Sequence, residues 1–217
     1  LTSHRNTFIN NSINIFSSSS YGIRISGPSN FNNFENSNIT TTQINSHGIF
    51  FLTNSNNNSF TNIKIITNNT NAVSVYLSNT NHNFTFSDSV FKSGNASDFF
   101  IHKSVTGSIW NFTNITRADS TMNITWMAGA NGTLNVHWRL EAIANHSNGS
   151  IIQNVNINAT DRNNALRFSA LTGSDGRITK QSLLEYIRNA TSGTNFTYYS
   201  NYTFNATFQG QNLTQSW

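Results

Sequence analysis

The chain has 217 residues, a formal net charge of +4, 36% hydrophobic residues and no cysteine. This length and apolar content suffice for a buried core, and the lack of cysteine excludes disulfides, thiolate metal sites and a cysteine nucleophile. The basic residues are scattered, and no apolar run approaches the roughly 18 residues of a membrane span, so we expect neither a nucleic-acid partner nor a membrane span.

Charged residues make up only 9% of the chain, against roughly 25% in an ordinary soluble domain. Asn, Ser and Thr must therefore supply most of the polar surface. A disordered, low-complexity Asn-rich tract is an alternative interpretation, but Phe, Ile and Val recur at regular positions, which favours a folded protein. The chain begins Leu1-Thr2-Ser3, and we interpret it as a processed product or a fragment.

The first half of the sequence is an internal repeat with a nearly constant period, which two sets of apolar markers share. One marker recurs at Phe8, Phe34, Phe60, Phe84 and Trp110, and a second at Ile23, Ile49, Val73 and Phe99. Between the markers lie short alternating runs such as Ile13-Asn14-Ile15, which are typical of brief strands with one buried face. Stacked coils of such strands bury a continuous apolar column, and Asn at the corners tolerates left-handed backbone conformations. The pattern predicts a parallel β-helix over residues 1–116.

This rhythm, in NTFINNSINIFSSSSYGIRI and SFTNIKIITNNTNAVSVYL, resembles the right-handed parallel β-helix repeats of pectate-lyase-like proteins, in particular the NosD-like repeats of archaeal surface proteins. The resemblance implies a right-handed solenoid and an archaeal cell-surface protein. The copper-binding label of that family is not carried over, because the sequence has no His or Met cluster suited to copper.

The second half, residues 117–217, changes to longer alternating strands with tight turns. Leu134 to Ile143 alternates strongly, Asn148-Gly149 predicts a hairpin turn, and further strands are expected over 151–160, 165–171 and 196–208. Several strands at this spacing predict a small antiparallel β-sandwich. The order VHWRLEAIANHSNGSIIQNVNINATD, LTGSDGRI, LLEYIRN, YTFNATFQG resembles the carboxypeptidase-regulatory-like, transthyretin-like sandwich, and the resemblance implies a turn at 173–176 and an extended segment over 180–188. The alternative for 180–188 is a short helix.

Few residues are candidates for chemistry. The acids of the repeat half, Glu35, Asp88 and Asp98, fall at different phases of the repeat, so the sequence predicts no catalytic residues and no enzyme. The six histidines, His4, His47, His82, His102, His137 and His146, include no pair at metal-ligand spacing, so we expect no metal site and no cofactor. The tryptophans Trp110, Trp126, Trp138 and Trp217 are either core anchors or platforms for sugars.

The strongest pattern is a set of eighteen N-x-[ST] sequons, which mark acceptors for N-linked glycans and therefore an extracellular protein. The acceptors are Asn10, Asn38, Asn57, Asn68, Asn83, Asn95, Asn111, Asn114, Asn123, Asn131, Asn145, Asn148, Asn158, Asn189, Asn195, Asn201, Asn205 and Asn212. An Asn-rich chain also produces sequons by chance, which is the alternative interpretation. If they are used, sugar supplies the hydration that the few charges cannot.

These patterns together predict an all-β, self-assembling structural glycoprotein at the cell surface, a subunit of a sheath, surface layer or fibre whose main partner is another copy of itself. Contacts between copies are expected in the sequon-poor stretches 17–34 and 162–188. The alternative is an adhesin-like module that binds a glycan or another cell. A row of exposed aromatic residues along one solenoid face would favour the alternative.

Overall fold

The computed structural model describes residues 4–79, 82–94, 97–118, 122–189 and 195–216. The chain forms two compact units. Unit 1 comprises Leu1–Asn135 and Arg188–Phe196, and unit 2 comprises Val136–Ile187 and Thr197–Trp217. Across the described residues every regular element is a strand, and none is a helix long and apolar enough to cross a membrane.

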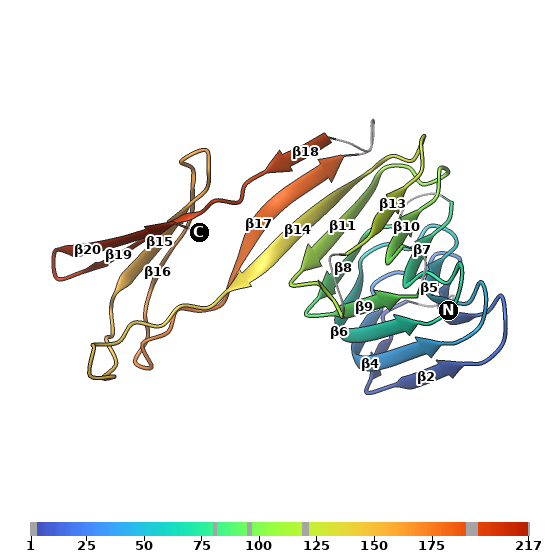
Figure 1. Ribbon diagram of the computed structural model, residues 1–217, viewed down its shortest axis with the longest axis horizontal. Coiled ribbons are helices and arrows are strands. Elements are labelled where there is room, and N and C mark those ends of the chain that lie inside the picture. Colours follow the sequence, from blue (N-terminus) through green and yellow to red (C-terminus); the bar gives the residue numbers. More distant parts are fainter. Residues whose placement is uncertain (1–3, 80–81, 95–96, 119–121, 190–194, 217) are drawn as a thin grey trace. The chain divides into compact units, whose positions relative to one another are not determined.

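Unit 1 is a parallel β-solenoid of about five coils, as the sequence predicts (Figure 1). One sheet joins strands of successive coils in the order β1 (Thr7–Ile9), β4 (Asn33–Thr41), β6 (Asn58–Thr67), β8 (Phe84–Ser87), β11 (Ser108–Thr113) and β14 (Gly132–Leu140). The same sheet includes β2 (Ser12–Ile15), β9 (Val90–Ser93) and β12 (Thr116–Arg117). The solenoid pairs that join these strands are parallel, so each coil lies on the previous one.

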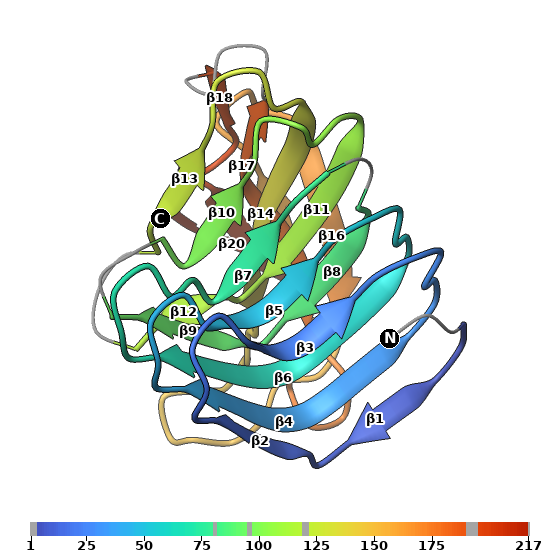
Figure 2. The ribbon, with the colours of Figure 1, turned by 90° about the vertical axis from the view of Figure 1, so that its right-hand side faces the viewer.

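The second sheet of unit 1 closes each coil on the other side of the core. Its order is β3 (Tyr21–Ile25), β5 (His47–Phe51), β7 (Val75–Leu77), β10 (Phe99–Ile101) and β13 (Ile124–Trp126), and these strands lie side by side in Figure 2. Because β13 pairs in parallel with β10, the last coil continues past the boundary that the sequence predicts after residue 116.

The core of unit 1 contains a column of phenylalanines, to which each coil contributes one ring. Phe60 is fully buried, and its ring stacks on Phe34 at 4.9 Å and on Phe86 at 4.5 Å between centroids. Phe8 and Phe112 extend the column by pairing with Phe34 and Phe86. Stacked aromatic pairs contribute about 0.5–1.5 kcal/mol beyond their buried area, so the column adds stability at every coil.

Three markers of the predicted register are wrong: Phe84, Trp110 and Val73. Phe60 pairs with Phe86 and not with Phe84. Trp110 pairs with Phe84 and is displaced with it. Similarly, Ile49 pairs with Val75 and not with Val73. Residues two positions apart point to the same face of a strand, so an alternating pattern cannot distinguish registers that differ by two.

The connection after β9 accounts for the irregular spacing. Thr67 still pairs with Ser93 at the regular spacing of the repeat, whereas Val75 pairs with Phe99, which shortens that coil by two positions. The chain therefore loses two residues between Ser93 and Phe99, and all strands before this connection keep the regular spacing.

A buried asparagine ladder runs beside the first coils. The Asn6 side-chain amide donates to Asn32 Oδ1 at 2.9 Å, and that of Asn32 donates to Asn58 Oδ1 at 3.0 Å. Phe84 occupies the next position of this ladder and Trp110 the one after it. Phe84 and Trp110 thus occupy the ladder positions of the later coils and are not part of the phenylalanine column. For this reason they are apolar like the column residues but do not pair with them.

One corner of each coil adopts a left-handed backbone, as the asparagine content predicts. The residues there have φ between 49° and 59° and recur once in every coil: Asn10, Asn36, Asn62, Asp88 and Asn114. Asn and Asp adopt this conformation more readily than other non-glycine residues. Side-chain bonds between coils fix the corner, with Asn62 Nδ2 donating to Asn36 Oδ1 at 2.8 Å and Asn114 Nδ2 to Asp88 Oδ1 at 2.9 Å.

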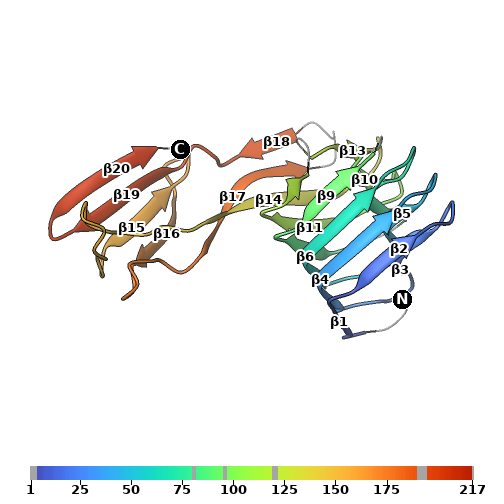
Figure 3. The ribbon, with the colours of Figure 1, turned by 60° about the horizontal axis from the view of Figure 1, so that its bottom comes forward.

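Unit 2 contains a four-stranded antiparallel sheet, shown in Figure 3. Its order is β16 (Leu166–Leu171), β15 (Asn156–Thr160), β19 (Thr203–Phe208) and β20 (Gln211–Ser216). One face packs on apolar side chains from outside the sheet, among them Leu140, Ile178 and Leu183. The predicted antiparallel strands are confirmed. A single sheet does not show the transthyretin-like sandwich that the sequence resemblance implies.

Three local predictions for unit 2 are confirmed. Asn148-Gly149 forms a hairpin turn with Gly149 at φ 85°, and Asp175-Gly176 forms another with Gly176 at φ 72°. The segment for which a helix was the alternative is the strand β17 (Gln181–Asn189), which neighbours β14 and β18 (Asn195–Tyr198).

Removing a ring from the phenylalanine column should be costly. We expect Phe60→Ala, and likewise Phe34→Ala, to lower the free energy of unfolding by about 3–5 kcal/mol, because each removes a buried ring and leaves a cavity. Urea denaturation followed by circular dichroism measures this. Phe16→Ala, at a side chain 74% exposed, is the matched control and should change stability by less than about 0.5 kcal/mol. Equal stability of Phe60→Ala and wild type would contradict the stacking.

Candidate binding site

The three carboxylates that the structure describes in unit 1 are engaged in structural contacts in different coils. Glu35 accepts a bond from Asn33 Nδ2 at 2.5 Å, and Asp88 accepts one from Asn114. Asp98 is buried, accepts the backbone N–H groups of Ser93 and Asn123, and lies 3.4 Å from Arg117. Within the described ranges no group of three or more His, Cys, Asp or Glu side chains gathers as a metal site would require.

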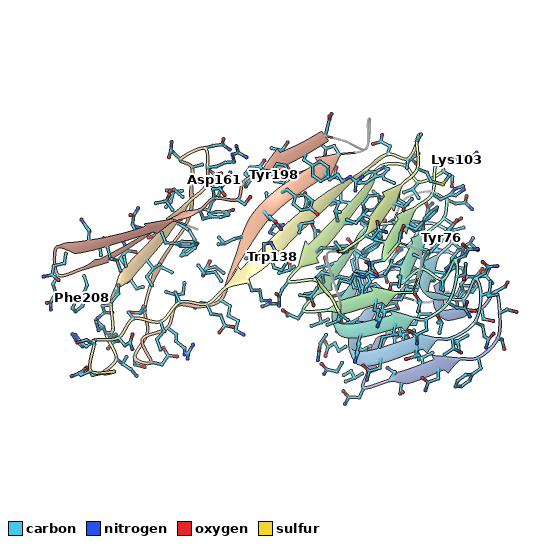
Figure 4. All side chains as sticks on the ribbon, viewed as in Figure 1. Tyr76, Lys103, Trp138, Asp161, Tyr198 and Phe208 are labelled. Carbon is cyan, nitrogen blue, oxygen red and sulfur yellow. The ribbon has the colours of Figure 1, made fainter. Side chains whose placement is uncertain are left out.

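The described tryptophans separate into different roles. Trp110 is completely buried in the solenoid core. Trp126 is half-buried, and the Arg188 guanidinium lies over its ring, 5.1 Å from the centroid. Trp138 on β14 is 42% exposed, and Figure 4 labels it. Trp217 lies outside the described residues. The sequence alone could not choose among these four rings.

Trp138 lines a pocket of about 440 Å³ in unit 2. This volume falls in the range of roughly 300–1,000 Å³ found for small-molecule sites. The walls come from β14, β17 and the segment that leads from residue 200 into β19. The lining residues are Trp138, Arg139, Leu140, Leu183, Glu185, Ser200, Asn201, Tyr202 and Phe204. We call this the Trp138 pocket. It combines aromatic and aliphatic walls with one carboxylate, one guanidinium, one amide and the hydroxyl groups of Ser200 and Tyr202.

Hydrogen bonds hold the polar wall of the Trp138 pocket in place. The indole Nε1–H of Trp138 donates to Glu185 Oε2, which fixes both side chains. The backbone N–H groups of Tyr199 and Ser200 donate to the Glu185 carbonyl at 2.8 and 3.2 Å. Burial raises the pKa of Tyr202, so its hydroxyl is neutral and donates to the Leu184 carbonyl at 2.7 Å. The pocket is therefore largely formed before any ligand arrives.

Most of the described sequon asparagines are exposed. Asn95 lies outside the described residues, and none of the other seventeen is buried. Twelve are exposed: Asn10, Asn38, Asn57, Asn68, Asn123, Asn131, Asn145, Asn148, Asn189, Asn195, Asn201 and Asn212. Five are half-buried: Asn83, Asn111, Asn114, Asn158 and Asn205. Accessibility is a requirement for attaching a glycan. The twelve exposed positions meet it, whereas the side-chain Oδ1 of Asn158 is buried.

An aromatic row also follows the outer face of the second solenoid sheet. Phe50, Tyr76 and Phe100 occupy paired positions in successive coils, and their ring centroids lie 5.3 and 4.8 Å apart with interplanar angles of 27° and 18°. Because each ring covers the face of the next, the row presents mainly ring edges outward. We therefore assign it to covering the sheet and favour the single ring of Trp138 as a binding surface.

His47 belongs to the same outer face. Its ring lies 4.8 Å from Tyr76, and its Nδ1 accepts the backbone N–H of Val73 at 3.2 Å. Burial lowers the pKa of His47 to about 4. An acceptor at Nδ1 places the proton of the neutral ring on Nε2.

Comparison with known proteins identifies no family for this chain. No family model matches the sequence, and no curated protein matches it. The structure is similar to a solved domain described as the Siphovirus 9NA tailspike receptor binding domain, with a TM-score of 0.32 and 11% sequence identity. The match covers 91% of this chain and 41% of that one, so this chain spans about two fifths of its length. The resemblance to NosD-like repeats therefore stands on the residue pattern alone.

The pKa of His47 predicts acid sensitivity. The pKa of His47 is near 6.5 in the unfolded chain and about 4 in the folded chain. Between pH 4 and pH 6.5 the unfolded state therefore binds more protons than the folded state. The stabilising contribution of neutral His47 is complete above pH 6.5 and is lost progressively as pH falls toward 4.

We expect His47→Asn, whose Oδ1 can accept the Val73 N–H, to lose less stability than wild type over this range. Urea melts at several pH values measure the difference. The control is His146→Asn at an exposed hairpin position, which should follow the wild-type profile. If His47→Asn also follows it, the assignment of a buried neutral ring is wrong.

Proposed function

We propose that this chain is an extracellular, N-glycosylated β-solenoid module of the adhesin-like kind that binds a glycan in the Trp138 pocket. The observation that carries the proposal is the exposed indole ring of Trp138 in a preformed pocket with polar groups at its margin. The binding surface belongs to unit 2.

The chemistry of the pocket suits a sugar. A sugar ring has a face of C–H groups, which packs on aromatic rings such as Trp138, Tyr202 and Phe204. Its hydroxyl groups both donate and accept, and Glu185, Asn201 and Ser200 offer matching oxygen and nitrogen atoms. The Glu185 carboxylate accepts the Trp138 indole N–H through Oε2 and keeps further acceptor capacity for the hydroxyl groups of a ligand.

Binding is favoured over catalysis because carboxylates of the chain serve structural contacts. Asp161 is buried and bonds Arg167, and the Glu141 carboxylate forms an ion pair with Lys180 at 2.5 Å. General acid–base cleavage of a glycan needs two carboxyl groups flanking one bond, and the Trp138 pocket contributes only Glu185. The proposed activity is recognition without turnover.

The extracellular and glycosylated character is supported by the accessible sequons. Seventeen acceptors are described and none of these residues is buried. The chain has only 9% charged residues, so its surface needs another source of hydration. Attached glycans would hydrate this neutral surface and reduce association between copies.

Trp138→Ala should weaken glycan binding by roughly 30-fold, equivalent to losing about 2 kcal/mol at a central aromatic anchor. A glycan array identifies the ligand, and titration calorimetry compares the variants. Leu171→Ala, at a side chain 61% exposed in the same unit and outside the pocket, is the control and should bind like wild type. The proposal fails if the folded wild-type protein binds no glycan, or if Trp138→Ala binds as tightly as wild type.

A self-assembling structural subunit is the second candidate. Within the described residues β1, β2 and β3 pair on one side only, with β4 or β5. Phe8, Ile13 and Ile23 are half-buried there and line a hollow of about 230 Å³. Unpaired strand edges are templates for further strands, and part of this end falls in the sequon-poor stretch 17–34.

Light scattering over a wide range of protein concentration tests this candidate. Self-assembly predicts that wild type forms growing assemblies, and that the double variant Ile13→Lys/Ile23→Lys stays smaller because two charges replace apolar contacts. Stable wild-type monomers at all concentrations would rule against this candidate and leave glycan recognition as the sole proposal.

A further inference from the structure

One sequon acceptor lies in the wall of the Trp138 pocket itself. Asn201 begins the sequon Asn201-Tyr202-Thr203, its side chain is exposed, and it lines the pocket together with Glu185 and Tyr202. None of the other sixteen acceptors that the structure describes is among the residues of this pocket. Asn201 is thus both an acceptor for an attached glycan and part of a surface suited to binding sugar.

The loop that carries Asn201 is held against the pocket. The residues before it bond the Glu185 carbonyl through two backbone N–H groups, and Tyr202, directly after it, bonds the Leu184 carbonyl. Asn201 itself has a left-handed backbone with φ 74° between these anchors. Its position relative to Glu185 is therefore fixed, and so is the starting point of any glycan attached to its Nδ2.

We propose that the N-linked glycan of Asn201 folds into the Trp138 pocket of its own chain and is the resident ligand of that pocket. This inference rests on the proposed function, because it needs both glycosylation and a pocket that accepts sugar. In the attachment step, a lipid-phosphate-linked sugar is the donor. The bond from Asn201 Nδ2 to the anomeric carbon forms, the bond from that carbon to the phosphate oxygen breaks, and Nδ2 loses one proton.

Tethering makes even weak recognition effective. A ligand held by a short flexible linker experiences an effective concentration in the millimolar range, so a pocket with millimolar affinity for one sugar would be occupied about half of the time or more. Free glycans must then compete with the attached one. Occupancy of Asn201 would set how strongly the module binds external glycans, which makes this sequon a regulator of recognition.

The experiment compares Thr203→Ala with wild type, both produced in a host that glycosylates the chain. This substitution removes only the sequon of Asn201, keeps the strained Asn201 backbone unchanged, and preserves the Thr203 carbonyl that accepts from Thr160. Thr207→Ala, which removes the sequon of Asn205 on the same strand, is the matched control. Mass spectrometry confirms which acceptors are occupied.

Oxidative footprinting of Trp138 is the first readout, with the half-buried Trp126 as internal reference. We expect Trp138 to be oxidised at least about twofold faster in Thr203→Ala than in wild type or Thr207→Ala, since a tethered sugar would cover it for about half of the time. Equal rates in all three proteins, or an unoccupied Asn201 in native material, would overturn the inference.

Binding of free glycans is the second readout and separates the two proposals. Tighter binding by Thr203→Ala than by wild type, lost again in Thr203→Ala/Trp138→Ala, supports both. Equal binding by wild type and Thr203→Ala with equal Trp138 oxidation supports external recognition and overturns the resident glycan. Protection of Trp138 in wild type without binding of external glycans by either protein supports the resident glycan and overturns only the recognition of external glycans.

Discussion

Every coil of unit 1 must place each side chain over the equivalent side chain of the coil before it, because parallel strands pair residue by residue at a spacing of about 4.8 Å. This constraint governs which residues the solenoid tolerates. A ring must stack on a ring, as Phe60 does between Phe34 and Phe86. A buried amide must bond an amide, as Asn32 does between Asn6 and Asn58. At the corner from Asn10 to Asn114, the left-handed backbone keeps Asn or Asp in every coil.

The same constraint explains the composition. The stacked positions use neutral groups that pair with their own kind, since like charges one coil apart would repel. Amides and hydroxyls satisfy this requirement, and charged residues do not. A surface built from neutral groups is poorly hydrated, which gives a physical reason for the many accessible sequons. Unit 2 has no such repeat, and it is there that a single ring, Trp138, lies exposed in a pocket.

The sequence predicted the architecture well because periodicity reports directly on stacking. The regular spacing of the apolar markers identified the solenoid, the Asn content identified the corners, and Gly149 and Gly176 identified two turns. The register of Phe84 was missed because Phe84 and Phe86 point to the same face, so only the length of the distant connection from Ser93 to Phe99 decides between them.

The pocket could not be predicted because its walls come from three separate segments, β14, β17 and the segment that leads from residue 200 into β19. Trp138 lies in an alternating strand much like that of Trp110, and alternation alone does not tell a core ring from an exposed one. Asn201 was recognised as an acceptor, but its place beside Trp138 depends on the bonds from Tyr199 and Ser200 to Glu185. Tertiary contacts of this kind leave no periodic signal in a sequence.

Disulfide trapping tests the stacking register most directly. Because the chain has no cysteine of its own, only the two introduced thiols can form a disulfide within it. Thr61 pairs with Ser87, their hydroxyl oxygens lie 3.1 Å apart, and both are partly exposed. A disulfide needs Cα atoms roughly 4.4–6.8 Å apart, whereas partners displaced by two residues are roughly 7–8 Å apart. The observed register, in which Thr61 pairs with Ser87, predicts that Thr61→Cys/Ser87→Cys forms a disulfide under mild oxidation. Thr61→Cys/Thr85→Cys should stay reduced. Efficient closure of the Thr85 pair and not of the Ser87 pair would contradict this register.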